Sequence, residues 1–305
     1  MTRVQANLLL LLAGAIWGMG FVAQSTAMDA LEPFTFIACR FSLATAVLLP
    51  FAYYETHKLR APSDQLITIT QLKWFAIIGV CLFMGMATQQ VGLLTTTVTN
   101  SGFLTGLYVV FTPFVAVLLY RQWPHPVVWP AALIAFLGLF LLSGGNFESL
   151  VIGDALTIIS AGFWALQVVL ISRYVAESRR PLVLSAIQFG VTALLAWCVA
   201  LSVEVIEWSS IKLATFEIVY TGIFAGGLAF TLQVIGQRYT TAPQAAIFLS
   251  SEAPFAALFG MWLLGERLGW IGLIGCAFIL SAMLLVELAP DWLSRRIQSK
   301  AELAE

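Results

Sequence analysis

The chain has 305 residues, of which 60% are hydrophobic and only 10% are charged, and its formal net charge is −1. Soluble domains carry about 25% charged residues, so this composition excludes a protein that is soluble on its own.

Unbroken apolar runs of about 20 residues recur along the chain, and each is long enough to cross roughly 30 Å of hydrocarbon as a helix. Strands of a membrane barrel would be alternating segments of about ten residues, which these runs are not. We therefore predict an all-α polytopic membrane protein. Its ten predicted transmembrane helices run near 7–28, 33–54, 72–94, 99–119, 127–143, 153–172, 182–203, 215–236, 243–264 and 269–288.

Little sequence remains outside these spans. The longest break, 55–71, is too short for a soluble catalytic domain. The apolar start of the chain is typical of a signal peptide, but nine spans follow it and no small-residue cleavage site closes it, so we keep it as the first span. For the tail from Pro290 to Glu305, either a short amphipathic helix on the inner surface or a simple polar segment fits.

The chain also repeats itself. PFVAVL at 113–118 returns as PFAALF at 254–259, and QVGLLTTTV at 90–98 returns as QVIGQRYTTA at 233–242. We expect two repeats of five helices, residues 1–145 and 146–288, followed by a cytoplasmic tail, 289–305. An odd number of spans turns the second repeat upside down. Such inverted repeats predict a substrate site near the membrane midplane and transport by alternating access.

Basic residues predict the orientation, because short loops rich in Lys and Arg stay on the cytoplasmic side. With both termini inside, the inner segments hold twelve of the fifteen Lys and Arg residues, and the outer segments hold only Lys212 and Arg267. We therefore predict that both termini are cytoplasmic.

Three motifs carry a resemblance to a known family: AGAIWGMGFVAQ in the first span, CRF in the second, and SSEAPFAALFGMWLLGERL at 250–268. Together with ten spans in two halves, they resemble the EamA family of the drug/metabolite transporter superfamily. The first half departs from the third motif, since RQWPHP stands where the second half has Gly265 and Glu266. The resemblance implies a multi-pass carrier of the inner or plasma membrane, often a proton-linked or facilitative exporter of small metabolites, but not a particular substrate.

Two charges lie deep in predicted spans. Glu252 is roughly 14 Å from the inner end of its span, and Arg40 is roughly 10 Å from the outer end of its own. Each costs on the order of 3 kcal/mol there unless it is paired or wetted. Glu252 is either a site for proton coupling or a substrate amine, or one partner of a structural bridge to Arg40.

Amides and aromatic residues form a second candidate set, because side-chain amides in lipid face a bundle interior or a cavity. Trp17 and Trp164 hold matching places in the two halves, as do Gln90 and Gln233. Helix packing and interhelical hydrogen bonding are the alternatives for these residues. The full set is Trp17, Gln24, Gln89, Gln90, Asn100, Tyr108, Trp164, Gln167, Gln188, Gln233 and Gln237. Our predicted site contains Glu252, Arg40, Trp17, Gln90, Trp164, Gln233 and Tyr108.

Two prolines, Pro113 and Pro254, lie at matched points of the fourth and ninth spans. Each removes a backbone hydrogen bond, so we expect both helices to bend there, either to shape a cavity or simply to curve.

A carrier explains these features together. An enzyme would require a nucleophile, a metal cluster or an acid and base pair within the membrane, and none is evident. A channel filter and an ATP-binding loop are likewise not seen. We expect a small-molecule substrate, no cofactor, no metal and no nucleic-acid partner. One acid and one arginine favour an amino acid or a related compound, with a vitamin-like or drug-like aromatic compound as the alternative. Proton coupling, transport direction and oligomeric state stay open.

Overall fold

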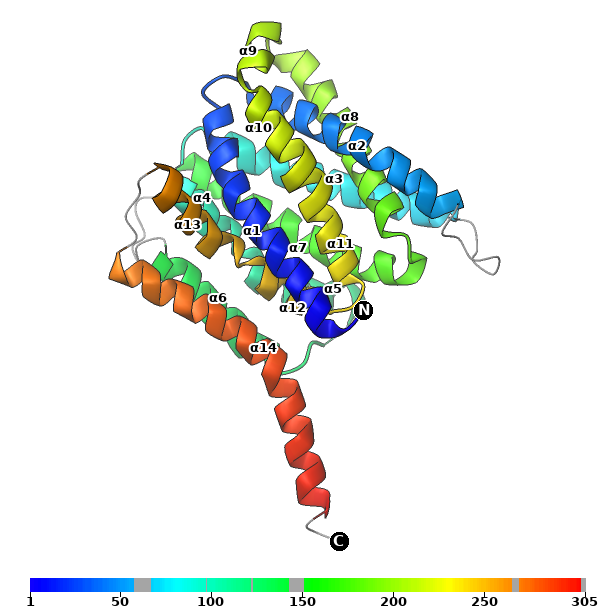
Figure 1. Ribbon diagram of the computed structural model, residues 1–305, viewed down its shortest axis with the longest axis vertical. Coiled ribbons are helices and arrows are strands. Elements are labelled where there is room, and N and C mark those ends of the chain that lie inside the picture. The colour runs from blue at the N-terminus through cyan, green and yellow to red at the C-terminus, as the bar shows by residue number, and fades with distance from the viewer. Residues whose placement is uncertain (58–66, 97, 122, 143–150, 265–268, 303–305) are drawn as a thin grey trace.

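The computed structural model describes residues 1–57, 67–96, 98–121, 123–142, 151–264 and 269–302, without the side chains of 98–100, 264 and 290–302. Every regular element in this part of the chain is a helix (Figure 1). The helices are α1 (Arg3–Ala27), α2 (Pro33–His57), α3 (Ile69–Gly92), α4 (Val98–Thr105), α5 (Tyr108–Tyr120), α6 (Val128–Leu142), α7 (Ile152–Ser178), α8 (Pro181–Val203), α9 (Trp208–Leu213), α10 (Thr215–Val219), the π-helix η1 (Tyr220–Ala229), α11 (Phe230–Gln237), α12 (Ala242–Leu249), α13 (Glu252–Leu264) and α14 (Trp270–Glu302).

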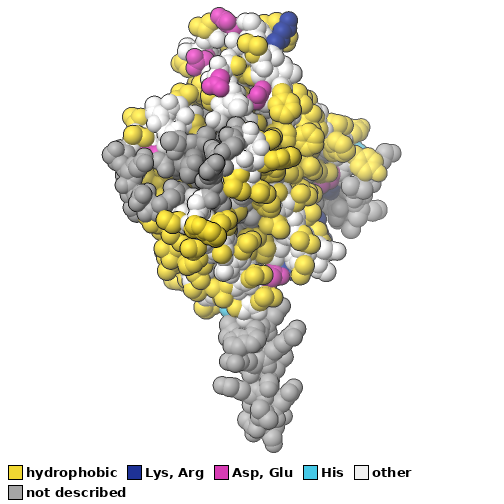
Figure 2. Space-filling view, turned by 60° about the vertical axis from the view of Figure 1, so that its left-hand side comes forward, with side chains coloured by type: hydrophobic (Ala, Val, Ile, Leu, Met, Phe, Trp, Pro, Cys, Tyr) yellow, Lys and Arg dark blue, Asp and Glu magenta, His cyan; other side chains and the backbone are white. Residues whose placement is uncertain are grey.

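These helices confirm the predicted fold class. Within the described residues, nine helical segments are long and apolar enough to cross a membrane, and α6 is a shorter apolar helix in the place of the fifth predicted span. Hydrophobic side chains cover the flanks of the molecule, as a lipid-facing surface requires (Figure 2). The Gly265 and Glu266 pair lies outside the described residues.

The last helix is longer than its predicted span. α14 continues as one helix to Glu302, so the segment predicted as a tail from residue 289 begins inside it. In Figure 1 this end of α14 extends beyond the bundle, on the side where the N-terminus lies. We call this side the termini face, and the opposite side the far face. The side chains that would give the tail an amphipathic surface lie outside the described residues.

The two halves contact each other in matched pairs. α2 packs on α8, and α6 packs on α14, so that the second and fifth spans of each half meet their own counterparts. The third span of the first half, α3, packs on α7 and α8 of the second half. Its counterpart, formed by η1 and α11, packs on α1 and α2 of the first half. These contacts are those of two repeats related by a pseudo-two-fold axis. Because each repeat has five spans, the two run through the membrane in opposite directions.

Glycine contacts fix which positions correspond. A Cβ added to Gly79 on α3 would lie 2.9 Å from the Gln188 carbonyl oxygen, and one added to Gly222 on η1 would lie 2.9 Å from that of Arg40. Arg40 and Gln188 are therefore equivalent, as the sequence repeat ACRF and AIQF also indicates. Near the helix ends, Gly92 packs on Gly153 and Thr157 of α7. In the same way, Gly236 packs on Ala6 and Leu10 of α1.

The second half contains one additional residue, which η1 accommodates. Between Gly222 and Gly236 lies one residue more than between their counterparts Gly79 and Gly92. A π-helix spans five residues per hydrogen bond and is the usual way for a helix to take up a single extra residue. α3 is α-helical throughout, whereas its counterpart passes through η1 before becoming α11.

α2 and α8 cap each other. Both begin with a proline, Pro33 and Pro181, which removes one of the unpaired N–H groups of a helix start. Glu204, just after α8, accepts hydrogen bonds from the N–H groups of Phe34 and Thr35 at 2.8 and 2.7 Å. At the other face Glu55, near the end of α2, accepts from Leu182 and Val183 at 3.3 and 2.9 Å. The two helices are thus held together at both faces of the membrane.

The fourth and ninth spans are broken rather than smoothly bent. α4 ends at Thr105 and α5 begins at Tyr108, and in the second half α12 ends at Leu249 and α13 begins at Glu252. The breaks are not at the prolines where we expected bends, because Pro113 is the sixth residue of α5 and Pro254 is the third residue of α13. Broken helices are tolerated at membrane depth where they are buried in protein or line a cavity.

Candidate functional site

A cavity lies where the two broken helices meet the rest of the bundle. Its empty volume, including its opening, is about 490 Å³. Its walls are mostly aromatic, amide and apolar, with one acid and one guanidinium. The lining residues are Trp17, Phe21, Gln24, Arg40, Met86, Gln89, Thr105, Tyr108, Trp164, Val168, Phe230, Gln233, Leu249 and Glu252.

The cavity brings together six of the seven residues predicted for the site. Glu252, Arg40, Trp17, Trp164, Gln233 and Tyr108 all line it.

Gln90 does not line the cavity. Its side chain is fully buried, and its Nε2 atom donates to the Gln24 carbonyl oxygen at 3.4 Å. Gln89 takes its place in the lining and donates from Nε2 to Thr105 Oγ1 at 2.8 Å. One residue turns a side chain by about 100° around a helix. Gln89, rather than Gln90, is thus the counterpart of Gln233 in the cavity.

Other members of the amide set lie next to the cavity. Gln233 Nε2 donates to Gln167 Oε1 at 3.4 Å, and Gln167 Nε2 donates to Gln188 Oε1 at 3.2 Å. Gln237 Nε2 donates to the Val168 carbonyl oxygen and to Ser172 Oγ. These residues follow the hydrogen-bonding alternative that the sequence left open. The side chain of Asn100 lies outside the described residues.

Arg40 is buried against aromatic rings. It is 1% exposed, and its Nη1 atom donates to Gln24 Oε1 at 2.9 Å. Its guanidinium carbon lies 4.9 Å from the centroid of Phe41 and 5.5 Å from that of Phe36. Arg40 forms no ion pair with Glu252 in the described structure. The structural bridge weighed from the sequence is therefore not formed.

Glu252 and Tyr108 occupy equivalent places in the two halves. Each is the first residue of the helix that follows a break, α13 and α5 respectively. The Tyr108 hydroxyl lies near the Glu252 carboxylate, and the hydroxyl itself has no hydrogen-bond partner. The breaks thus bring an acid and a phenol together within the membrane.

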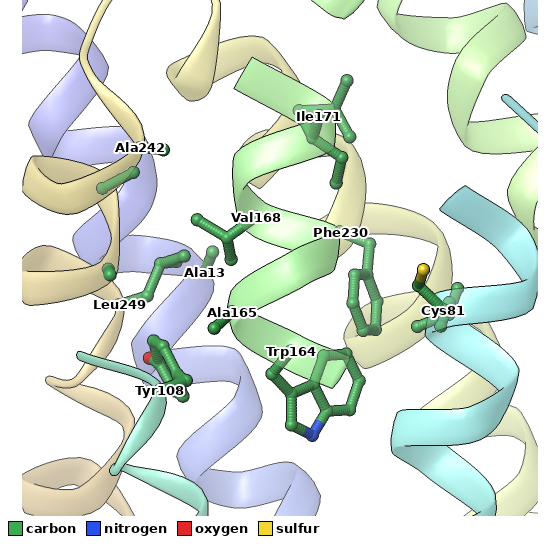
Figure 3. Close-up of a cluster of buried hydrophobic side chains, with 14 of the residues drawn as sticks. Ala13, Cys81, Tyr108, Trp164, Ala165, Val168, Ile171, Phe230, Ala242 and Leu249 are labelled. Atoms are coloured by element: carbon green, nitrogen blue, oxygen red, sulfur yellow. The ribbon is translucent and has the colours of Figure 1, made fainter. Parts of the chain in front are cut away.

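Aromatic rings form one wall of the cavity. Phe230, at the start of α11, lies 4.7 Å from Trp17 and 6.0 Å from Trp164 between ring centroids. Figure 3 shows Trp164 and Val168 projecting from α7, with Phe230 beside the Trp164 ring. Trp17 Nε1 donates to the Ala225 carbonyl oxygen of η1 at 2.9 Å. Trp164 Nε1 is buried without a hydrogen-bond partner.

The lining is built from equivalent positions of the two halves. Trp17, Phe21 and Gln24 follow one another at the spacing of Trp164, Val168 and Ile171. The remaining equivalences follow from the glycine contacts and from the helix breaks. Six equivalent pairs line the cavity: Trp17 and Trp164, Phe21 and Val168, Met86 and Phe230, Gln89 and Gln233, Thr105 and Leu249, and Tyr108 and Glu252. The cavity therefore lies on the pseudo-two-fold axis.

Two lining residues, Gln24 and Arg40, have counterparts outside the lining. These counterparts, Ile171 and Gln188, are fully buried. The cavity is thus symmetric except for an extension toward Gln24 and Arg40.

Several lining residues were not predicted: Phe21, Met86, Thr105, Val168, Phe230 and Leu249. They are mostly apolar, in a chain that contains 22 phenylalanines, so residue type alone gives no signal. Helical spacing does give one for Phe21, which lies four residues from Trp17 on the same face of α1.

Four lining atoms are buried without a hydrogen-bond partner: Arg40 Nε, Tyr108 OH, Trp164 Nε1 and Gln233 Oε1. Buried polar atoms are nearly always hydrogen-bonded in proteins. Three of the four groups carry donor hydrogens and one is an acceptor. Together with the Glu252 carboxylate, they form a set of groups that a polar ligand can satisfy.

Comparisons with known proteins agree with this architecture. The model of the EamA-like transporter family matches the chain twice, at residues 4–144 and 151–288. An uncharacterised transporter of Archaeoglobus fulgidus is 32% identical over 94% of this chain and 87% of its own length. The uncharacterised transporter YwfM of Bacillus subtilis is 24% identical over 98% of this chain and 97% of its own length. A solved crystal structure superposes with a TM-score of 0.77 at 20% identity, covering 97% of this chain and 99% of the other.

Proposed function

The chain belongs to the EamA-like transporter family, and from this premise we propose that it carries an amino acid or a closely related zwitterion through the on-axis cavity by alternating access. It is a multi-pass membrane transporter; the substrate class, the mechanism and the direction are our proposal. The two opposite charges that line one cavity without pairing with each other carry the proposal.

A zwitterion satisfies both charges at once. A substrate carboxylate takes Arg40, whose Nε atom has no protein partner, and a substrate ammonium group takes Glu252. Hydrogen bonds to charged groups contribute about 1.5 to 3 kcal/mol each. These bonds offset the hydration free energy that the charged groups of the substrate lose when the substrate enters the membrane. A polyanion such as a sugar phosphate finds only one cation in the lining, and fits less well.

The aromatic wall supports a second candidate. Trp17, Trp164 and Phe230 line the cavity as one group of neighbouring rings, and aromatic rings stack on planar ligands. A vitamin-like or drug-like aromatic compound is therefore the alternative substrate. An aromatic amino acid satisfies both the charges and the rings.

Glu252 is also our candidate for proton coupling. The other titratable groups that line the cavity are Arg40 and Tyr108, and Tyr108 lies beside the Glu252 carboxylate. A carboxyl group that alternates between a proton and a substrate ammonium group would couple the two fluxes in opposite directions.

Charge distribution supports an orientation with both termini in the cytoplasm. Acidic side chains gather at the far face in Figure 2, where Asp29, Glu32 and Glu207 are exposed. The described cations near the termini face are Arg3, Lys73, Arg121, Arg173, Arg179, Arg180 and Arg238. By the positive-inside rule the termini face is cytoplasmic, and the far face is outside the inner or plasma membrane. Export is the direction that the family favours.

Counterflow in liposomes tests the proposal. Purified protein is reconstituted with unlabelled amino acids inside, and uptake of the same labelled amino acids is followed with and without a pH gradient. Riboflavin and cationic dyes form parallel panels. Amino-acid counterflow supports the proposal, whereas counterflow of only the aromatic panel supports the alternative. The absence of counterflow in every panel would contradict a carrier of either kind.

A further inference from the structure

The cavity is extended on one side of the pseudo-two-fold axis and closed on the other. Gln24 is three residues from the far end of α1, and Arg40 is about 10 Å from the far end of α2. The extension therefore points toward the far face. The equivalent Gln188 is about 10 Å from the end of α8 at the termini face, and it is shut off from the cavity.

Three aromatic rings and two amides close the side of Gln188. Phe41 and Phe189, the neighbours of Arg40 and Gln188, have ring centroids 5.6 Å apart, and Phe230 lies against Phe189 at 5.8 Å. Behind these rings Gln167 donates to Gln188 Oε1. Ile171, the counterpart of Gln24, lies further along α7 than Val168 (Figure 3).

Gln188 nevertheless retains an unused donor. Its side chain is 0% exposed, and its Nε2 atom has no hydrogen-bond partner. Leaving such a donor unpaired in a protein interior destabilises the folded state. The bond from Gln167 uses only the Oε1 atom of Gln188 and leaves the amide nitrogen without a role in the packing. The presence of this unpaired donor is explained if the Nε2 atom donates a hydrogen bond to a ligand in another conformation of the protein.

Inverted repeats define that other state. When two such halves exchange conformations, the site opens to the opposite face, and each position takes over the surroundings of its counterpart. We propose that Gln188 is the substrate contact of the state open to the termini face, with Ile171 beside it. In this state Gln188 and Ile171 enter the lining, and Arg40 and Gln24 leave it. The inference rests on the proposed carrier function and adds a second ligand-binding position, suited to a carboxylate or another hydrogen-bond acceptor.

The two positions differ in charge. Arg40 meets a carboxylate with a guanidinium, whereas Gln188 offers a neutral amide. The carboxylate makes both bonds charge-assisted, but the guanidinium adds an opposite charge and can bind both carboxylate oxygens at once. We therefore expect the apparent affinity for a carboxylate-bearing substrate to be about tenfold weaker from the termini face than from the far face.

Cysteine labelling during counterflow tests the assignment. All four native cysteines are replaced, and Gln188→Cys, Arg40→Cys and Ala186→Cys are each reconstituted. Ala186, two residues from Gln188, is a buried control on another face of α8. A membrane-impermeant methanethiosulfonate that carries a trimethylammonium group is added from either face. In parallel, the exchange of a mixture of labelled L-amino acids is measured in liposomes that contain wild-type protein or one of the variants.

We expect Gln188→Cys to react from the termini face at least about tenfold faster than Ala186→Cys, and Arg40→Cys to react from the far face. Gln188→Cys reacting only as slowly as Ala186→Cys, while wild-type counterflow proceeds, would overturn the inference and leave the carrier intact. Absent wild-type counterflow with a reactive Gln188→Cys would instead contradict the proposed substrate class and leave the path standing. The absence of both would overturn both proposals.

Discussion

Phe41 on α2 and Phe189 on α8 hold equivalent places in the two halves of the protein, and their rings meet with centroids 5.6 Å apart. Such a contact between counterparts marks the pseudo-two-fold axis. Phe230 contacts both rings, at 6.3 and 5.8 Å, and lines the cavity. The aromatic wall of the cavity is thus part of the joint between the two repeats.

Removing either charge from the cavity should weaken amino-acid exchange. Glu252→Gln and Arg40→Gln each lose one charged partner of the proposed substrate, and about 1.5 to 3 kcal/mol corresponds to a rise in KM of about 10- to 100-fold. Counterflow measures this change. Unchanged KM and unchanged pH dependence in Glu252→Gln would contradict both its substrate and its coupling role. Glu207→Gln, at the exposed far surface, is the matched control.

Adjacent glutamines on α3 should behave differently. Gln89→Leu removes a lining amide that holds Thr105, and we expect transport to fall several-fold. Gln90→Leu removes a buried amide whose Oε1 atom has no partner and whose Nε2 atom makes only the long bond of 3.4 Å to the Gln24 carbonyl oxygen, so we expect a small cost to folding and persistent transport. Comparison of transport rates at equal expression separates the two. Equal losses of transport in both variants would indicate disruption of α3 packing, and would contradict a specific role of Gln89 in the cavity.

Glycine at the α1–α13 contact should be irreplaceable. A Cβ at Gly18 would lie 2.6 Å from Phe255 Cβ and 2.7 Å from the Ala256 nitrogen, so Gly18→Ala must push the helices apart. We expect a loss of about 1 to 3 kcal/mol of stability. A Cβ at Gly162 on α7 meets nothing within 4 Å. Gly162→Ala should therefore be neutral or slightly stabilising. Thermal unfolding in detergent measures both, and similar midpoints for the two variants would contradict this packing.

Loss of a reciprocal cap should also lower stability. Glu204→Ala leaves the N–H groups of Phe34 and Thr35 without their acceptors, at a cost of about 1 to 2 kcal/mol. Glu207→Ala is the control, since Glu207 accepts only a long bond from Ser209 at 3.4 Å. A lower unfolding midpoint for Glu204→Ala alone is the expected outcome. Identical midpoints would show that water replaces the cap without loss.

The sequence was sufficient for the architecture but not for the helix faces. Hydropathy identifies the spans, Glu252 was found because it is a charge deep within one of them, and Trp164 was found because it matches Trp17 in the first half. Choosing Gln90 over Gln89 was wrong for the cavity, because both occur in one apolar run and only packing decides which faces inward. η1 left no signal, since one extra residue in an apolar helix alters neither composition nor length noticeably. Phe230 is one of many phenylalanines, and its role depends on contacts with Trp17 and Trp164.

The exchanged caps of α2 and α8 imply an order of assembly as the chain is synthesised. Phe34 and Glu204 are separated by 170 residues, so α2 enters the membrane well before its cap exists. α8, by contrast, finds Glu55 already in place when it arrives. The first repeat therefore remains incomplete at its far face until the second repeat has crossed the membrane twice. A ribosome-bound chain that stops short of Glu204 should keep this helix end open to water, to lipid headgroups or to the insertion machinery.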